Sequence, residues 1–374
     1  MTGRVIKLMV SARDSGAAQN LTPVIRDART DPRFQVTVVA DGAAKNVFSS
    51  KNISFETAEN RHTTLAEAGQ FLVAHHCPDA ILAGGSGPGT GIDEALIVAG
   101  RGRPCFVLQD YWADVNPAIR GADVVFFVID EKAGQLSWDL HRAKTVVSGP
   151  PKYRDYQTLD LWTRSVELRE KLGIAADRPI ACFFGQAGLP PKAYARTVAA
   201  FFAAASVALE NPILCFRRHP NEPPGALVEI ERATAVSVAD ASRGTAEEWL
   251  SLAAISASCF SNSGYDLAYL NRAAPEPLGA MIYVMGEPEI RLTYQEWTKL
   301  TTEPVSAQGL ALKVEDMALL SKSVHDGLTA ETRQRLWQAA RELLPDPSRA
   351  CARILDRIRA DVVAVNAPTA GNAK

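Results

Sequence analysis

Two short segments carry the strongest signal in this sequence. The first, Pro212-Ile213-Leu214-Cys215-Phe216-Arg217-Arg218-His219-Pro220, is an apolar run that ends in a cluster of cationic and imidazole side chains. The second, Ser261-Asn262-Ser263-Gly264, lies between the apolar segment Ala253–Phe260 and the helix-like segment Tyr265–Leu270. A strand that ends in Arg and His supplies charged donors, and a small-residue loop that opens a helix supplies free backbone N–H groups. Together the two segments predict a site for the phosphates of a nucleotide.

Apolar runs and helical segments alternate along the rest of the chain. In the first half, strand-like runs such as Val5–Val10, Phe34–Ala40 and Cys105–Leu108 are separated by helical segments. Continuous apolar strands between helices predict a parallel sheet that is buried on both faces. The alternation stops at the Gly/Pro-rich segment Val146–Pro151 and restarts with the strand-like run Pro179–Phe184.

We therefore predict an α/β protein with two Rossmann-like domains and a cleft between them. The predicted N-terminal domain covers residues 1–150, and the predicted C-terminal domain covers residues 151–345. A helix at residues 346–363 and a disordered tail at residues 364–374 follow. Ligands of such sheets bind beyond the carboxyl ends of the strands, so we expect the site residues in the loops at these ends.

Bulk composition narrows the class of protein. A chain of 374 residues suits about two domains, and 47% hydrophobic with 22% charged residues is typical of a globular protein. The net charge of −2 gives no reason to expect a nucleic-acid partner, so phosphate binding has to be local. No apolar segment is long enough to span a bilayer, and residues 1–7 lack the apolar core of a signal peptide. The six cysteines are scattered without a C-x-x-C pair, which predicts reduced thiols in the cytoplasm.

The loop after the first strand offers a cation and a carboxylate. Arg13 is a candidate to pair with a carboxylate or phosphate, and Asp14 is a candidate base. Ser15 and Gly16 are expected to bind an acceptor through open N–H groups at the start of the next helix. The alternative is a helix N-cap with a surface arginine beside it.

A glycine-rich loop, Gly84–Gly91, joins another predicted strand to a helix. Its spacing does not match the G-x-G-x-x-G dinucleotide fingerprint, and it lacks the Lys-Ser/Thr pair of a P-loop. We predict a flexible lid or an acceptor-binding loop, with Gly87 and Gly89 as contacts. Asp93 and Glu94 are then caps of the following helix.

A carboxylate stands beside two aromatic residues where the strand Cys105–Leu108 ends. Asp110 is a second candidate base, and Tyr111 and Trp112 are candidate contacts of a sugar-like or aromatic acceptor. The alternative is an aromatic pair packed against the linker between the domains.

Three loops of the predicted C-terminal domain form a cradle for the nucleotide. Gly185 and Gln186 follow its first strand, where glycine lets a ligand approach the backbone. Arg217 and His219 follow the next strand. The third loop completes the cradle with Ser261, Asn262, Ser263 and Gly264. No spacing of histidines or cysteines suits a metal ion, so we expect neither a metal nor a cofactor.

These motifs resemble those of the GT-B superfamily, which includes the UDP-N-acetylglucosamine 2-epimerases, lipid-A-disaccharide synthase and related nucleotide-sugar glycosyltransferases. Val147–Pro150 looks like the junction that ends the N-terminal domain in this group. Arg217–Asn221 is similar to the strand end that contacts the nucleotide phosphate. Ser263-Gly264 is similar to the helix start that cradles the diphosphate, and Leu267–Pro275 is similar to the helix that follows. The resemblance covers nearly the whole chain, in order, as short motifs.

The resemblance implies a GT-B fold whose last helix crosses back onto the N-terminal domain. It also implies metal-independent chemistry, in which arginine, histidine and helix N-termini stabilise the departing phosphate. The glutamate that holds the ribose hydroxyls in this superfamily falls near Ala268 or Tyr269 here. Tyr265 or Asp266 is the candidate substitute.

The leading hypothesis is glycosyl transfer. A UDP-, CMP- or dTDP-linked sugar is the predicted donor, and a small molecule or glycan bound by the N-terminal domain is the predicted acceptor. Arg13 and His219 belong to the predicted catalytic set, in which donors stabilise the negative charge that grows on the phosphate. Asp14 or Asp110 takes the proton of the acceptor. A homodimer is left open.

Three alternatives accompany this hypothesis. A nucleotide-sugar 2-epimerase, hydrolysing or non-hydrolysing, would share the fold, but the first loop reads Arg13-Asp14-Ser15 where those enzymes have Arg-Pro-Glu. A non-catalytic nucleotide-sugar-binding protein would explain the missing ribose glutamate. A dehydrogenase is disfavoured because the dinucleotide fingerprint is missing.

Overall fold

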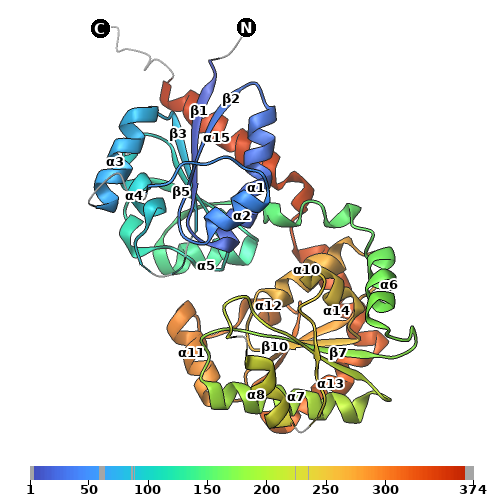
Figure 1. Cartoon of the computed structure of the whole chain (residues 1–374). Helices are drawn as coiled ribbons and strands as arrows, with labels where there is room; N and C mark the ends of the chain where they lie inside the picture. Colours follow the sequence, from blue (N-terminus) through green and yellow to red (C-terminus); the bar gives the residue numbers. More distant parts are fainter. Residues whose placement is uncertain are drawn as a thin grey trace, which may run out of the picture. The chain divides into compact units, whose positions relative to one another are not determined.

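The computed structural model describes residues 4–58, 64–85, 87, 89–223, 225–234 and 236–366. The chain divides into two compact units, both drawn in Figure 1. Unit 1 consists of Met1–Asp155 together with Pro345–Lys374, and unit 2 consists of Tyr156–Leu344.

Unit 1 is built on a six-stranded sheet in which all neighbouring strands are parallel. The strand order is β2-β1-β3-β4-β5-β6. The strands are β1 (Ile6–Ala12), β2 (Phe34–Ala40), β3 (Ala80–Gly84), β4 (Cys105–Leu108), β5 (Val124–Val128) and β6 (Lys144–Val147). The helices are α1 (Ser15–Thr30), α2 (Ala44–Ser50), α3 (Leu65–His76), α4 (Ile92–Ala99), α5 (Glu131–His141) and α15 (Ala350–Asn366).

Unit 2 repeats this plan with a second six-stranded parallel sheet. The strand order is β12-β11-β10-β7-β8-β9. The strands are β7 (Ile180–Phe184), β8 (Ile213–Arg217), β9 (Ala239–Asp240), β10 (Ile255–Ser258), β11 (Ala280–Val284) and β12 (Leu312–Val314). The helices are α6 (Leu161–Leu172), α7 (Pro191–Ala208), α8 (Ala226–Thr234), α9 (Ala246–Leu252), α10 (Ser263–Ala273), α11 (Pro288–Thr298), α12 (Pro304–Ala307), α13 (Leu320–Leu328) and α14 (Ala330–Leu343).

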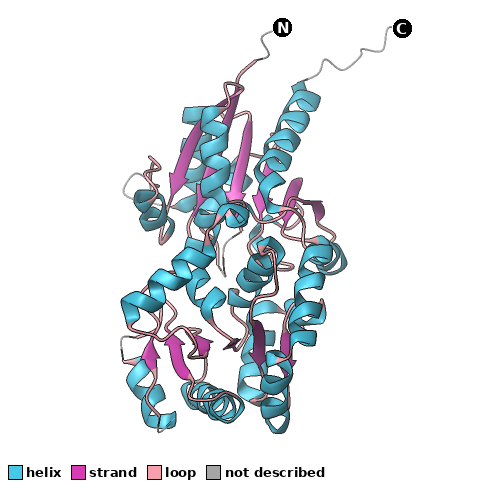
Figure 2. Cartoon of the chain, turned by 90° about the vertical axis from the view of Figure 1, so that its right-hand side faces the viewer, coloured by secondary structure: helices cyan, strands magenta, loops and turns pink. Residues whose placement is uncertain are grey.

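The central strands are apolar because helices lie on both faces of each sheet (Figure 2). Every residue of β3 and β4 in unit 1, and of β7 and β11 in unit 2, is buried. Strands of this kind have no face in contact with water, so their sequences show continuous apolar runs instead of alternation.

The last helix, α15, belongs to the core of unit 1. Ile354 and Ile358 are fully buried there among residues of α1 and β1. Polar contacts hold the connecting segments of the same unit: Arg353 Nη1 donates to Ser148 O at 3.0 Å, and Arg154 Nη1 pairs with Asp27 Oδ1 at 2.6 Å. The C-terminal segment therefore returns to unit 1 after the chain has completed unit 2.

Both strand orders fix where a ligand can bind. In unit 2 the order, read from β9, is third, second, first, fourth, fifth and sixth strand, and the direction reverses between β7 and β10. In unit 1 the direction reverses between β1 and β3. Ligands of open parallel sheets bind beyond the carboxyl ends of the strands at this reversal. A ligand of either unit is therefore expected at the loops after β1 and β3, or at the loops after β7 and β10.

Some elements differ from the prediction. Unit 1 continues through residue 150 to Asp155, because Pro151–Tyr153 forms a short 3-10 helix that packs in unit 1. Strand β6 was not predicted as a strand. Helix α15 runs to Asn366, past residue 364 where a disordered tail was predicted, and residues 367–374 lie outside the described part. Among the described helices, every one is too short or too polar to span a bilayer.

Candidate functional site

The loop after β1 places Asp14 at the start of α1. Asp14 Oδ1 accepts a hydrogen bond from Ala17 N at 2.9 Å, which is the N-cap role that the sequence left as an alternative. A side chain at Gly16 would overlap Asp110 Oδ2, so glycine lets the helix start lie directly against that carboxylate. The space beside Gly16 is thus filled by the protein itself, and Ser15 and Gly16 stay predictions as acceptor contacts.

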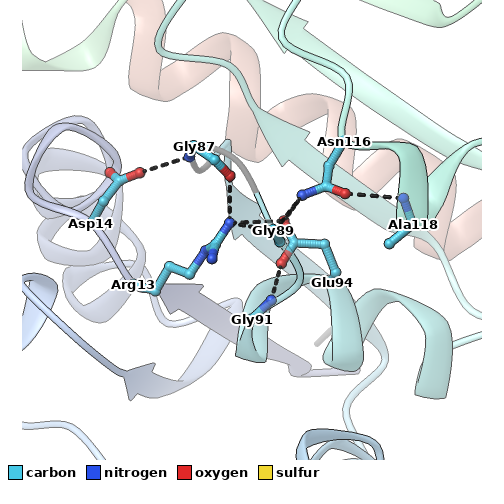
Figure 3. Close-up of polar contacts among 8 residues, drawn as sticks. All are labelled: Arg13, Asp14, Gly87, Gly89, Gly91, Glu94, Asn116 and Ala118. Carbon is cyan, nitrogen blue, oxygen red and sulfur yellow. Dashed lines mark hydrogen bonds and ion pairs between the residues drawn. The ribbon is translucent and has the colours of Figure 1, made fainter. Parts of the chain in front are cut away.

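Arg13 connects this loop to the glycine-rich loop after β3 (Figure 3). Its Nη2 donates to Gly87 O at 2.6 Å and to Gly89 O at 2.7 Å, and lies 3.9 Å from Glu94 Oε1. Asn116 Nδ2 also donates to Gly89 O, at 2.9 Å. The arginine that was expected to pair with a carboxylate or phosphate therefore holds two carbonyls of the chain, and the described part of the predicted lid is fixed by side chains.

Glu94 serves both the loop and its helix. Its Oε2 accepts from Gly91 N at 2.7 Å, and its Oε1 accepts from Asn116 Nδ2 at 2.9 Å. The first bond is the cap that the sequence indicated for this position. Asp14 contributes from the other side, because its Oδ2 accepts from Gly87 N at 3.3 Å.

Four carboxylates gather around this network. Burial, together with the charges of Asp110, Asp14 and Glu94, raises the pKa of Asp114 to about 7. Burial also raises the pKa of Asp14, with a further contribution from Asp110. A carboxyl group that titrates near neutral pH can take up and release protons under physiological conditions.

Asp114 was missed by the sequence analysis. It lies four residues after Asp110, past the two aromatic residues that drew attention to this loop. A side chain at Gly85 would come within 3.3 Å of Asp114 Oδ2, so the carboxyl group faces the end of β3. A small cavity of about 10 Å³ lies beside it, lined by Gly85, Asp93, Glu94 and Asn116 among others. That volume is roughly what one water molecule needs.

Two donors contact the Asp110 carboxylate. Asn20 Nδ2 donates to its Oδ1 at 2.6 Å, and Lys152 Nζ lies 3.3 Å from the same atom. The structure corrects the prediction that Trp112 contacts an acceptor. Trp112 is only 1% exposed, and its Nε1 donates to the Asp130 carboxylate at 3.1 Å. Trp112 is thus a buried structural residue. Tyr111 packs edge-to-face on it, with ring centroids 5.2 Å apart.

In unit 2, Arg217 is the last residue of β8, and it is half-buried. Its Nη1 donates to Ala241 O at 2.6 Å and to Gly244 O at 3.1 Å. Among the described residues no acceptor lies within bonding distance of its Nε or Nη2. The guanidinium is therefore anchored through one nitrogen, and the other two are left to bind an anion. The phosphate role of Arg217 stays a prediction.

His219 has a defined tautomer when it is neutral. Its Nδ1 accepts from Asn221 N at 3.1 Å, so the ring proton belongs on Nε2. Burial lowers the pKa of His219, which favours the neutral form near pH 7. The ring can thus donate one hydrogen bond from Nε2. Its backbone is fixed as well, because His219 N donates to Glu222 Oε2.

The loop after β7 does not have the open glycine that the sequence predicted. A side chain at Gly185 would overlap Glu222 Oε2, so this glycine makes room for a carboxylate of the protein and not for a ligand. Gln186 joins two loops: its N donates to Tyr194 Oη at 3.0 Å, and its Oε1 accepts from Phe260 N at 3.0 Å. Gln186 therefore positions the loop that follows β10.

The start of α10 carries a row of hydroxyl groups. Ser258 Oγ donates to Ser261 Oγ at 2.9 Å, and Ser261 Oγ lies 2.5 Å from Ser263 Oγ. Within the described residues Asn262 gives no side-chain bond to the helix, and Ser261 caps the first amides of α10 instead: Ser263 N donates to Ser261 Oγ at 3.4 Å, and Gly264 N donates to Ser261 O at 3.4 Å. A side chain at Gly264 would overlap Tyr283 Oη. The hydroxyl groups of Ser261 and Ser263 are donors of the kind that an anion needs.

The two candidate ribose residues have different surroundings. Tyr265 is buried and packs edge-to-face on Tyr269, with ring centroids 5.1 Å apart. Asp266 is half-buried, and its charge adds to burial in raising the pKa of Tyr156 well above its usual value. Asp266 is the better placed of the two to meet a ligand, and its role in ribose binding stays a prediction.

Comparison with solved structures identifies the fold. A UDP-N-acetylglucosamine 2-epimerase from Neisseria meningitidis bound to UDP-GlcNAc superposes with a TM-score of 0.64 at 12% identity, over 95% of this chain and 100% of that one. The chain has the GT-B fold. The same enzyme from Methanocaldococcus jannaschii gives 0.64 at 13% identity, over 95% and 100% of the two chains. A glycosyltransferase from Rickettsia africae gives 0.65 at 10% identity, over 98% and 100%.

The predicted fold class is therefore confirmed. No family model matches the chain, and no curated protein matches its sequence. Likeness at such low identity establishes the fold, so the reaction has to be argued from the residues of each unit.

Proposed function

We propose that this chain is an enzyme of nucleotide sugars that inverts the configuration at carbon 2 of the sugar. Two of the similar structures are UDP-N-acetylglucosamine 2-epimerases, and one of them holds UDP-GlcNAc. This reverses the order of the sequence-based hypotheses, in which glycosyl transfer came first.

The observation that carries the proposal is the group of carboxylates around Asp114. Inversion at a carbon requires that its hydrogen leaves as a proton from one face and that a proton returns to the other face. Side chains that do this work best when their pKa lies near the working pH. Asp114 has a pKa of about 7, and the pKa of Asp14 is also raised. We assign Asp114 as the principal proton carrier and Asp14 as its candidate partner.

Unit 2 supports the nucleotide half of the proposal. His219 offers one hydrogen from Nε2, and Arg217 offers Nε and Nη2 while Nη1 is anchored. The hydroxyl groups of Ser261 and Ser263 at the start of α10 add further donors for a diphosphate. No metal is needed for this set to stabilise negative charge, since fixed donors act in the same way.

The direct test is to incubate the full chain with UDP-GlcNAc and no acceptor, and to analyse the products by NMR and chromatography. The proposal expects the 2-epimer, either still linked to UDP or released with free UDP. Asp114→Asn should abolish the product. The matched control is Asp123→Asn, since Asp123 is an exposed carboxylate of unit 1 that pairs with Lys144 on the surface.

Glycosyl transfer is the second candidate, because a glycosyltransferase covers 98% of this chain at a similar TM-score. In that reaction Asp14 or Asp110 takes a proton from the acceptor. UDP release that starts only after an acceptor is added would favour transfer over epimerisation. UDP binding without turnover under either condition would favour a nucleotide-sugar-binding protein.

A further inference from the structure

A second pocket lies in unit 2 between α6 and the start of α9. Its volume is about 570 Å³, which falls inside the usual range of roughly 300–1,000 Å³ for small-molecule sites. One wall comes from α6, with Arg164, Leu168 and Lys171, and the other comes from the loop before α9, with Arg243 and Gly244. The proposed epimerisation does not use this pocket.

The walls of the pocket are fixed to one another and to the core. Ser165 Oγ of α6 bonds to Ser251 Oγ of α9 at 3.0 Å. Trp249 is buried, and its Nε1 donates to Arg243 O at 2.6 Å. Leu168 is nearly buried and gives the pocket an apolar floor. The pocket is thus a preformed hollow, which lowers the entropic cost of binding a ligand there.

The charges of the pocket leave two guanidinium groups uncommitted. Lys171 pairs with Glu167 at 3.5 Å, and Glu248 Oε2 accepts from Thr245 N at 2.7 Å. Arg164 and Arg243 are exposed, and neither side chain has a hydrogen bond or ion pair to any residue that the structure describes. Free guanidinium groups above an apolar floor suit a small molecule with carboxylate or phosphate groups.

The same loop is bonded to the candidate phosphate residue. Arg217 Nη1 donates to Ala241 O and to Gly244 O, so the loop between β9 and α9 holds the guanidinium in position. Gly244 has a φ of +80°, and a side chain there would press on Glu248 and Leu168. Arg217 therefore touches the inner side of a loop whose outer side lines the pocket.

We propose that this pocket is a regulatory site for a small polyanion that pairs with Arg164 and Arg243. An anion bound in the pocket restricts the motion of the loop from Ala241 to Thr245. The loop then holds the Arg217 guanidinium in the orientation in which Nε and Nη2 bind the nucleotide phosphate. The anion and the nucleotide each strengthen the binding of the other, since coupling between two sites is reciprocal. The coupling rests on the proposed nucleotide site, whereas binding of the anion does not.

The test uses citrate as the probe, because its three carboxylates can pair with both arginines. Calorimetric titration of the full chain with citrate should show binding that Arg164→Gln/Arg243→Gln abolishes. The control Lys192→Gln/Arg232→Gln removes two exposed cations of unit 2 outside the pocket and should leave binding unchanged. Citrate should also tighten UDP binding about fivefold in the native chain and not in the pocket variant.

The outcomes separate this inference from the proposed function. Equal citrate binding by the native chain and the pocket variant would overturn the site. Citrate binding that leaves UDP affinity unchanged, or weakens it, would overturn the regulatory coupling. If UDP does not bind at all while citrate binding depends on the two arginines, the pocket stands and the proposed nucleotide site fails.

Discussion

The two units are each built on a six-stranded parallel sheet, and the loops at the carboxyl ends of the strands carry opposite kinds of polar group. Beyond β1 and β3, unit 1 gathers the carboxylates Asp14, Glu94, Asp110 and Asp114. Beyond β7, β8 and β10, unit 2 gathers guanidinium, imidazole, hydroxyl and amide donors. The fold thus supplies two similar scaffolds, and the loop residues lead us to propose proton transfer in one and anion binding in the other.

A difference in packing accompanies the difference in charge. In unit 1, Arg13 and Asn116 tie the loops to one another with their side chains. In unit 2, Gly185 and Gly264 let the loops approach closely, against Glu222 and Tyr283. Proton-transfer groups need a shared, poorly solvated environment, whereas an anion site needs backbone amides that are not covered.

The largest expected effect is on turnover in unit 1. Asp114→Asn keeps the size of the side chain and removes the titrating proton, so epimerisation should fall by about 10²-fold or more. UDP affinity, measured by calorimetry, should not change, because the nucleotide is assigned to unit 2. Loss of UDP binding in this variant would show that the roles of the two units are not separate.

Stability should depend on pH through the same residue. The pKa of Asp114 is about 7 in the folded chain, against a usual value of 3.8, so the folded state binds its proton more tightly. Its contribution to stability is therefore fully present below about pH 4 and is lost as the pH rises through 7. Over that window the slope is at most about 1.4 kcal/mol per pH unit.

Urea unfolding of the native chain and of Asp114→Asn between pH 5 and 8 measures this contribution. The difference between the two free energies of unfolding should grow in favour of the variant as the pH rises. A constant difference would mean that Asp114 titrates at its usual pKa.

In unit 2, Gly264→Ala should destabilise the chain by about 2 kcal/mol. The added methyl group would overlap the Tyr283 hydroxyl group and its ring, both of which are buried. Differential scanning calorimetry should show a lower Tm for this variant. Gly87→Ala in unit 1 is the matched control, because a Cβ there meets no atom within 4 Å. Equal Tm values for the two variants would contradict the close packing at α10.

The smallest expected effect is on nucleotide affinity. His219→Ala removes one donor from a partly buried site, which should weaken UDP binding about tenfold. His325→Ala is the control, since His325 lies exposed on α13. Unchanged affinity in the His219 variant, measured by calorimetry, would remove the imidazole from the phosphate site.

The sequence predicted the regular elements better than the site. The strand Cys105–Leu108 and the helix Ala330–Leu343 have the bounds that their apolar patterns indicated. The parallel arrangement of the strands was predicted from continuous apolar runs, in which apolar and polar residues do not alternate. The resemblance to the GT-B superfamily pointed to the right fold.

The side-chain partners could not be predicted, because they depend on which loops meet. Nothing near Arg13 in the sequence indicates that it binds the carbonyls of Gly87 and Gly89, more than 70 residues away. Trp112 was predicted as an acceptor contact, whereas in the structure it is buried and its Nε1 donates to the Asp130 carboxylate. Asp114 has no motif of its own, and its raised pKa comes from burial and from the charges of Asp110 in the same loop, Asp14 and Glu94.

Hydrogen exchange at carbon 2 tests the central claim most directly. The full chain is incubated with UDP-GlcNAc in deuterium oxide without an acceptor, and the sugar is examined by NMR and mass spectrometry. Our account predicts one deuterium at carbon 2 in the product, formed by the native chain and by Asp123→Asn but not by Asp114→Asn. A sugar that keeps its original hydrogen at carbon 2, even though UDP binds and an added acceptor becomes glycosylated, would contradict the assignment of proton transfer to unit 1.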